Sequence, residues 1–419
     1  MLLTQTLKSV NNIDFIDQSE DNYTFYQSTP ENKSFNIIKE NLFQRIETII
    51  SEILISLKSN KLVRLKIPDI KKIRYFNYDE GFYCLNLSNE NDYIVLSLSS
   101  DSERIGKYTL IIYLILTAKL LKILSSIYQR HKQSSFMSKR ELYYSDKTLY
   151  TKIDQTIQDV TLLLGLTRFQ LGIFPSQKGL FAGDLSVFNS NGDLINNSYY
   201  YGKINLISYD YIIEKELFCK SNAEFILVVE KDTIFFNLVS NENFVTAFPN
   251  SIIVTAKGYP DSITRYFIKL VNASLQLPIL YFGDLDPCGL EIYLQYLFGS
   301  NSQNIIENDL IANNAINWIG LDFETISFLM NYEKLVALNL SNSDEDKISY
   351  LQQKEFFNEN NWLFTTNPWK FQITENLAKL KYQLYCMQTQ KVKYESEVIT
   401  SKYTDFLIII IKKIIHNPF

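Results

Sequence analysis

The sequence has little of what zinc proteins, secreted proteins and membrane proteins usually need. It contains two histidines and four cysteines in 419 residues, and the cysteines lie far apart without zinc spacing. A His-based metal cluster is excluded, and a reduced, intracellular compartment fits. No apolar run approaches the roughly 20 residues that span a bilayer, and the start, MLLTQTLKSVNNIDF, lacks the form of a secretory signal.

The chain also lacks a strong positive charge and a nucleotide-binding loop. Its formal net charge is −5 and its pI is about 5.4, so any contact with nucleic acid must be made by a local basic patch. No GxxxxGK[ST] motif occurs, so ATP chemistry would have to come from a partner. The length and a hydrophobic share of 46% predict an ordinary globular protein with several domains.

The first half of the sequence has mainly helical patterning. Apolar residues at helical spacing predict helices over 41–58 and 107–133, with short strands between them. Further along, an apolar stripe ends at Leu164, Gly165 breaks it, and Thr167 can cap a second short helix. This pattern predicts a helix-turn-helix, although it also suits two simple packing helices. The segment PSQKGLFAGDLSVF that follows predicts a β-hairpin wing.

The second half of the sequence alternates strands with helices. FILVVE, SIIVTAKG and ILYFGD are short apolar runs, and KDTIFFNLV and DSITRYFIKLVNASL between them read as helices. Such alternation predicts a parallel sheet. Beyond Asn304 the chain is expected to be mainly helical.

Three carboxylates follow two of these predicted strands. Glu230 ends the first run, and Asp284 and Asp286 end the third. Ligands of open parallel sheets bind at the carboxyl ends of the strands, and residues two apart in an extended segment project to one side. Such a group suits Mg²⁺ and phosphoryl chemistry. The alternative is purely structural: Asp284 starts a turn, and Asp286 precedes Pro287 where a helix opens.

A tyrosine lies close to an arginine in SKRELYY. Arg140 precedes Tyr144 by one helical turn, so the guanidinium and the phenol share a helix face. An arginine can hold a phosphate, and a tyrosine facing a phosphodiester can attack it to form a covalent link. In a chain with 28 tyrosines, Tyr144 and its neighbour Tyr143 could equally be packing residues. The two histidines, His131 and His416, are expected at the surface.

Six motifs in order are similar to one protein family. SKRELYYSD, QKGLFAG, FILVVEKDTIFF, TAKGYPD, YFGDLDPCGLEI and WIGLDFETI resemble the motifs of the meiotic DNA double-strand-break transesterases and their archaeal relatives, the topoisomerase VI A subunits. The resemblance runs from about residue 41 to KVKYESEVI. It implies an α/β multidomain fold with a helical segment over 1–60, a winged-helix (CAP-like) domain over 61–190, and a Toprim domain with a parallel sheet and C-terminal helices over 191–419.

The resemblance also implies roles for individual residues. Tyr144 would be the nucleophile and Arg140 would support the scissile phosphate. The carboxylates of Glu230, Asp284 and Asp286 would hold Mg²⁺. The DNA-facing residues would be Lys178, Lys257 and Tyr259. From the residues alone, Lys178 is more simply explained as a solvent-exposed residue of a turn, and Tyr259 as a residue that packs within a turn.

The partners implied by the resemblance are double-stranded DNA, a second copy of the chain, accessory meiotic proteins and a topoisomerase VI B-like subunit, in the nucleus and without a membrane. In this family one subunit's tyrosine meets the other's metal site, leaving 5′-phosphotyrosyl ends. Three alternatives stay open: a topoisomerase VI A subunit that reseals its breaks, a Toprim nuclease that uses water, and a non-catalytic DNA-binding scaffold.

Overall fold

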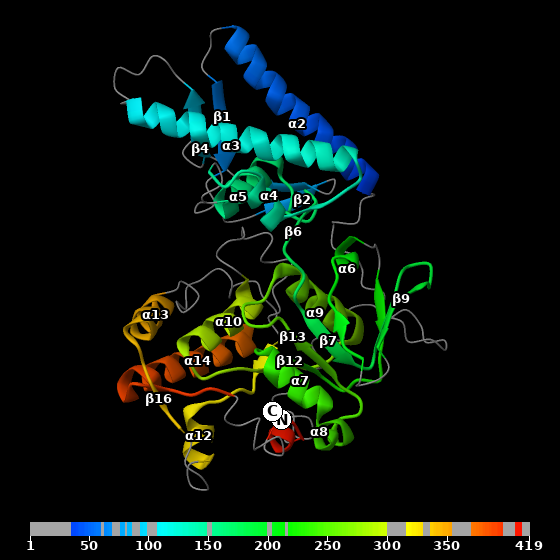
Figure 1. The fold of residues 1–419 in the computed structure, drawn as a ribbon, viewed down its shortest axis with the longest axis vertical. Coiled ribbons are helices and arrows are strands. Elements are labelled where there is room, and N and C mark those ends of the chain that lie inside the picture. The colour runs from blue at the N-terminus through cyan, green and yellow to red at the C-terminus, as the bar shows by residue number, and fades with distance from the viewer. Residues whose placement is uncertain are drawn as a thin grey trace.

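The computed structural model describes residues 35–59, 63–68, 76–79, 82–85, 93–98, 107–148, 153–198, 203–213, 217–299, 316–329, 336–353, 370–396 and 407–412. The ribbon forms two lobes, one of long helices and one built around a sheet (Figure 1). No helix in these ranges is long and apolar enough to cross a membrane.

The sheet lobe is organised around six strands in the order β10-β7-β13-β12-β14-β15. The strands β12, β13, β14 and β15 run parallel to one another, as the sequence predicts, while β7 and β10 add an antiparallel edge. The strand bounds are Asn205–Leu206 (β10), Leu180–Gly183 (β7), Ile252–Thr255 (β13), Ile226–Val229 (β12), Ile279–Phe282 (β14) and Ile316–Trp318 (β15).

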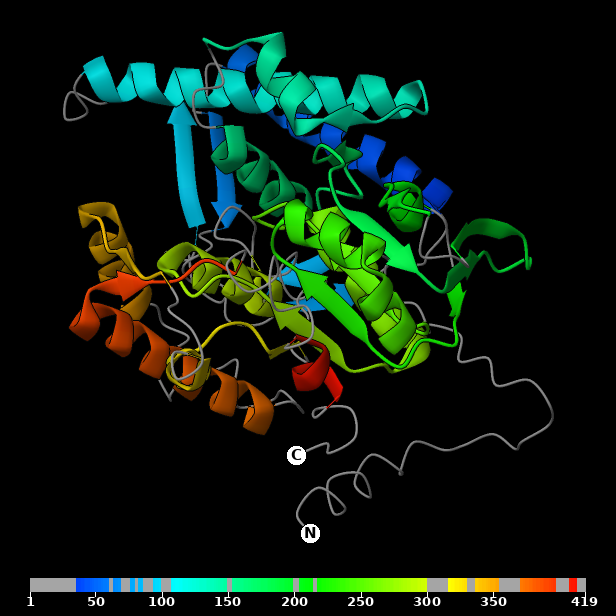
Figure 2. The same ribbon diagram turned by 60° about the horizontal axis from the view of Figure 1, so that its bottom comes forward.

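The central strands are apolar throughout because helices cover both faces of the sheet. Phe282 lies in the core on one face with the helices α7 and α8, while Tyr281 lies in the core on the other face with α9 and α10. Figure 2 shows the C-terminal turn, coloured red, beside the α7 and α8 side of the sheet. The helix bounds are Asp232–Ser240 (α7), Glu242–Ala247 (α8), Ser262–Leu275 (α9), and Pro287–Phe298 (α10).

Shorter elements complete this lobe. Trp318, Ile319 and Ile326 are buried, as expected for the WIGLDFETI segment. The remaining bounds are Leu185–Phe188 (β8), Leu194–Ser198 (β9), Asp210–Ile213 (α6), Phe218–Lys220 (β11), Phe323–Leu329 (α12), Leu338–Asn339 (β16), Asn342–Gln352 (α13), Lys370–Gln390 (α14) and Val392–Lys393 (β17).

The helical lobe has a separate core. The side chains of α2, α3, α5 and β1 pack together in it, and Arg45 of α2 donates to the Leu164 carbonyl 2.8 Å away at the end of α5. The predicted helices over 41–58 and 107–133 are confirmed. The bounds are Phe35–Lys58 (α2), Val63–Pro68 (β1), Phe76–Asp79 (β2), Phe82–Leu85 (β3), Tyr93–Leu98 (β4), Lys107–Lys132 (α3), Met137–Ser138 (β5), Lys139–Ser145 (α4), Ile153–Leu164 (α5) and Ile173–Phe174 (β6).

The predicted hairpin wing over 175–188 is wrong. The strand β7 pairs with β10 and β13, whereas β8 pairs with β9 and β11, so the two strands belong to different sheets. The four residues of β7 are all buried, which suits a covered sheet rather than a hairpin with one wet face. The six-stranded sheet therefore begins upstream of the domain boundary predicted at residue 190.

Two smaller expectations also fail. The second short helix after Gly165 is a set of turns: Gln170 reaches back to Thr167, with its backbone N–H 3.2 Å from the Thr167 hydroxyl. His131, expected at the surface, is 3% exposed, because it lies in the last turn of α3 and packs against Gly172. His416 lies outside the described residues.

Candidate active site

Tyr144 is presented by a short capped helix in the helical lobe. The helix α4 begins after Ser138, whose side chain accepts a hydrogen bond from the Glu141 N–H, and Leu142 anchors it in the core. Tyr143 packs against the same core, whereas Tyr144 is 51% exposed. Of the two adjacent tyrosines, Tyr144 is therefore the one whose ring is more accessible to a large ligand.

Two cations lie over the Tyr144 ring. The Arg140 guanidinium carbon is 5.7 Å from the ring centre, as expected from the helical spacing, and Lys147 Nζ is 4.7 Å from it. Lys147 was missed from the sequence because it follows the helix, where spacing does not fix its direction. Positive charge beside the phenol favours the approach of a phosphate.

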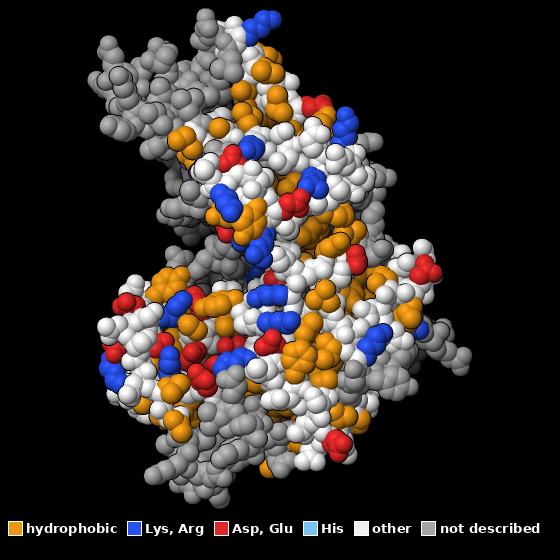
Figure 3. Space-filling view, in the orientation of Figure 1, with side chains coloured by type: hydrophobic (Ala, Val, Ile, Leu, Met, Phe, Trp, Pro, Cys, Tyr) orange, Lys and Arg blue, Asp and Glu red, His pale blue; other side chains and the backbone are white. Residues whose placement is uncertain are grey.

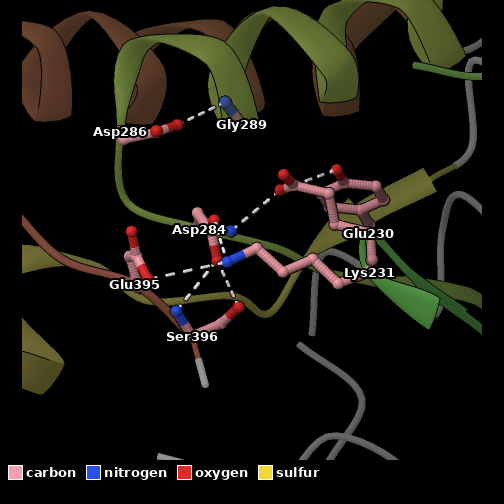
Figure 4. Close-up of polar contacts among 8 residues, drawn as sticks. Glu230, Lys231, Asp284, Asp286, Gly289, Glu395 and Ser396 are labelled. Atoms are coloured by element: carbon pink, nitrogen blue, oxygen red, sulfur yellow. Dashed lines mark hydrogen bonds and ion pairs between the residues drawn. The ribbon is translucent and has the colours of Figure 1, made fainter. Parts of the chain in front are cut away.

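At the sheet, Glu230 and Asp284 are brought together by adjacent strands. Glu230 follows β12 and Asp284 follows β14, and the Asp284 N–H donates to Glu230 Oε2 over 2.9 Å (Figure 4). Both residues are buried, at 6% and 4% exposed. The expectation that two strand ends present acid at the same edge of the sheet describes this pair correctly.

Asp284 is also held by residues far away in the sequence. Its Oδ1 accepts a hydrogen bond from the Ser396 N–H at 2.9 Å and another from the Ser396 hydroxyl. Its Oδ2 lies 3.0 Å from Lys231 Nζ, which is 3.8 Å from Glu395 Oε2. The contact of Ser396 and Glu395 with this site was not predicted, since 112 residues separate Ser396 from Asp284. Lys231 could have been noticed, because it directly follows Glu230.

Asp286 has a different local role. It is the N-cap of α10, and its Oδ1 accepts a 2.6 Å hydrogen bond from the Gly289 N–H. Figure 4 shows its side chain turned toward α10, while that of Asp284 points toward Lys231 and Ser396. The two side chains diverge, contrary to the expectation that they project to one side. The extended spacing is lost because a helix starts at the second aspartate.

Burial and repulsion between neighbouring carboxylates raise pKa values in this site. Desolvation, followed by the neighbouring Asp284, raises the pKa of Glu230 to about 8. Burial also raises the pKa of Asp286, although the hydrogen bond that it accepts from the Gly289 N–H opposes this rise.

The position of Gly289 must lack a side chain, because a Cβ there would lie 2.5 Å from the Asp284 carbonyl oxygen and 3.0 Å from Glu230 Oε2.

The acidic residues suit a cation, although they are not arranged as a finished metal site. No group of three His, Cys, Asp or Glu side chains poised to hold a metal ion occurs within the described ranges. Glu230 and Asp284 nevertheless supply buried oxygens, and the Lys231 ammonium already rests against Asp284. Such oxygens are the donors that hard divalent cations prefer.

The three residues expected to face DNA come together beside this site. Lys178 Nζ donates to the Tyr259 carbonyl at 2.6 Å, and Lys257 and Tyr259 follow β13 in one loop. The Gly258 N–H in this loop donates to the Glu230 carbonyl at 2.8 Å. Lys and Arg side chains also gather where the two lobes meet (Figure 3). Although the net charge of the chain is negative, it therefore has a local basic surface of the kind that contact with nucleic acid needs.

Comparison with known proteins agrees with this arrangement. Residues 225–412 match the Toprim domain of the family that joins the topoisomerase 6 A subunit with Spo11, and residues 117–173 match the family described as type IIB DNA topoisomerase. The chain belongs to the Spo11/topoisomerase 6 A-subunit family. Its sheet and acidic residues fall within the Toprim match, whereas α4 and Tyr144 fall within the type IIB match.

Similar proteins occur under both names of this family. The chain is 27% identical to the human meiotic recombination protein SPO11 over 86% of its own length and 84% of the relative's. It is 34% identical to the Drosophila melanogaster meiotic recombination protein W68 over 48% and 61% of the two chains. It is 36% identical to the A subunit of DNA topoisomerase 6 from Arabidopsis thaliana over 48% and 46%.

Proposed function

We propose that the protein makes double-strand breaks in DNA by transesterification, with Tyr144 as the nucleophile, and that these breaks initiate meiotic recombination. The observation that carries the proposal is the contrast between the two adjacent tyrosines. Tyr143 is partly buried against the core, while Tyr144 is exposed and has Arg140 and Lys147 over its ring. The similarity to the human protein along most of both chains supports the meiotic form of the reaction.

The chemistry exchanges one ester for another. The Tyr144 phenol oxygen bonds to phosphorus and loses its proton, the bond from phosphorus to the 3′ oxygen breaks, and the 3′ oxygen takes up a proton. The products are a 5′-phosphotyrosyl link and a free 3′ hydroxyl. Arg140 binds the phosphate oxygens and thereby stabilises the charge that develops on them.

Glu230 and Asp284 are proposed to hold Mg²⁺, with Asp286 as the third carboxylate. When bound, Mg²⁺ supplies positive charge to the phosphate oxygens and the leaving 3′ oxygen. Since Asp286 Oδ1 caps α10, the second oxygen of Asp286 is the one available to a ligand. An ion bound there would either displace Lys231 from Asp284 or accept the repulsion of its ammonium.

The proposed partners follow from the family. The protein would act on double-stranded DNA as a pair of copies, with accessory meiotic proteins and a topoisomerase VI B-like subunit, in the nucleus. Tyr144 and the acidic residues lie in different lobes of the chain, which suits a site completed by a second copy.

A search for covalent protein–DNA adducts tests the proposal. The protein is immunoprecipitated from meiotic cells under denaturing conditions, and attached oligonucleotides are end-labelled. We expect label on the wild type and on Tyr143→Phe, and none on Tyr144→Phe or Asp284→Ala. Equal label on Tyr144→Phe would assign the attack to another residue. Absence of label from every form, in cells that make breaks, would favour a scaffold or a hydrolytic nuclease.

A second candidate is a topoisomerase VI A subunit that reseals its breaks. The 36% identity to the Arabidopsis thaliana protein favours it. Resealing predicts that purified protein, supplied with an ATPase subunit, relaxes supercoiled DNA without leaving stable adducts. Stable adducts that persist in meiotic cells contradict this candidate.

A further inference from the structure

The backbone of the loop that carries Tyr259 is held by two distant parts of the chain. Its backbone turns through positive φ angles at Lys257 (55°) and Gly258 (87°), and the Gly258 N–H bonds to the Glu230 carbonyl at 2.8 Å. Lys178 reaches the Tyr259 carbonyl from before β7, at 2.6 Å. The loop therefore has a set position relative to the acidic residues at the sheet edge.

The side chain of Tyr259 is fixed as well. Its hydroxyl donates to Glu291 Oε2 on α10 at 2.5 Å, and the same oxygen accepts from Lys347 Nζ on α13 at 2.7 Å. The Glu291 side chain is only 15% exposed, so it has few other positions to adopt. Burial and the adjacent Glu291 raise the pKa of Tyr259, which keeps the hydroxyl protonated as a donor.

This arrangement leaves the ring accessible while its far end is held. Tyr259 is 40% exposed even though its hydroxyl and carbonyl are both bonded. Core packing does not explain a charged anchor on a surface ring, because a buried aromatic needs no such restraint. An exposed aromatic face held in one place is what nucleic-acid-binding proteins use to stack on bases or to wedge between base steps.

We propose that Glu291, itself held by Lys347, is a positioning residue that fixes the Tyr259 ring against DNA and so helps to set where a duplex settles relative to the acidic site. The inference rests on the proposed function in that its ligand is DNA. A ring of fixed position meets base steps in a fixed register, and base steps differ in how readily they unstack. Loss of the anchor should therefore change base preference more than overall affinity.

The test uses binding, without cleavage. Full-length protein carrying Tyr144→Phe is incubated with duplexes randomised over the central positions, and the bound fraction is sequenced. We expect Glu291→Gln and Tyr259→Phe, each added to Tyr144→Phe, to change the base preference in the same way. Overall affinity should stay within about threefold, because the phosphate contacts that dominate affinity are unchanged. The double variant should resemble either single one.

Glu345→Gln is the matched control. Glu345 is an exposed carboxylate on the same helix as Lys347 and is paired with Lys391 at 2.7 Å, so its loss changes the charge equally without touching the ring. We expect its base preference to match that of the Tyr144→Phe parent. Lys347→Met, which removes the support of Glu291, should shift the preference in the direction of Glu291→Gln.

Two results would overturn the inference. An unchanged preference in both Glu291→Gln and Tyr259→Phe, with a changed one in Tyr259→Ala, would mean that the ring matters but its anchor does not. An unchanged preference in all three would mean that the ring does not meet the bases. Failure of the Tyr144→Phe parent to bind any duplex would instead count against the proposed function, which separates the two.

Discussion

At the scale of single residues, Lys231 occupies the position of most interest in the acidic site. Its ammonium lies 3.0 Å from Asp284 Oδ2 and 3.8 Å from Glu395 Oε2. A divalent cation that binds Asp284 must displace this charge or accept its repulsion. We therefore expect the lysine to lower the affinity of the proposed metal site while it stabilises the metal-free protein.

We expect Lys231→Met to bind Mn²⁺ more tightly than the wild type. The gain should be about tenfold, which corresponds to roughly 1.4 kcal/mol for one partly buried charge. Titration calorimetry of the metal-free protein measures it. Lys391→Met, which removes an exposed ammonium paired with Glu345, serves as the control and should leave the affinity unchanged. Weaker binding by Lys231→Met would show that the lysine supports the ion.

Glu230 predicts a dependence of stability on pH. Its pKa is raised from 4.5 to about 8 in the folded protein, so folding favours the protonated carboxyl. That contribution is complete below about pH 4.5 and is lost as the pH rises through 8. Between pH 6 and 8, the free energy of unfolding of the metal-free wild type should fall relative to that of Glu230→Gln, by at most about 1.4 kcal/mol per pH unit.

Urea unfolding in the presence of a chelator, at several pH values, checks this expectation. The difference between wild type and Glu230→Gln isolates this carboxyl from the other titrating groups, including Asp286. Two stability curves that stay parallel from pH 6 to 8 would contradict the raised pKa.

At the scale of elements, Asp286 belongs both to the acidic site and to the start of α10. Asparagine caps helices about as well as aspartate does, whereas alanine does not. We expect Asp286→Ala to lower the free energy of unfolding by about 1 kcal/mol and Asp286→Asn to change it by only a few tenths. Urea unfolding of the metal-free forms measures both.

The same pair of variants separates the cap from the proposed metal role. Both lose a carboxylate, so both should bind Mn²⁺ more weakly than the wild type. If Asp286→Asn kept full affinity, Asp286 would be a helix cap alone, and the ion would be held by Glu230 and Asp284 without it.

The elements of the sheet lobe were predictable wherever local pattern decides them. The runs around Val228, Val254 and Tyr281 are apolar throughout because helices cover both faces, and the sequence shows this directly. The partner of β7 was not predictable. A buried strand of four residues carries no mark of the edge that it will join, so a hairpin was the simplest expectation.

At the scale of the whole molecule, the helical lobe carries Tyr144 and the sheet lobe carries the acidic residues. Co-expression of Tyr144→Phe and Glu230→Gln chains tests whether two copies complete each other. A mixed pair has one intact composite site, made of Tyr144 from the Glu230→Gln chain and the acids of its partner. We expect adducts on the Glu230→Gln chain alone, and nicks in place of double-strand breaks.

The comparison with each variant expressed alone provides the control, since neither should form adducts. A site contained within one chain makes the opposite prediction, because neither chain in the mixture would then have both parts. Absence of adducts from the mixture would therefore contradict the paired arrangement.

The sequence predicts the motif residues of the candidate site but not the contacts that hold them in place. Tyr144, Arg140, Glu230 and Asp284 stand in local motifs, and the structure gives each a setting that suits its predicted role. The contacts that hold Asp284 could not be predicted from the sequence. Ser396 lies in KVKYESEVI, and nothing local in that segment indicates that its serine contacts Asp284, because tertiary folding alone brings the two together.

The contact between Asp284 and Ser396 bears on how the protein is made. The aspartate leaves the ribosome well before the serine, which follows 112 positions later, so the sheet can form before the partner that orients Asp284 has been synthesised. A product cut short before Lys393 would keep its tyrosine helix yet lack the hydroxyl and amide that orient Asp284. Completion of the acidic site therefore waits for synthesis of the segment that carries Ser396.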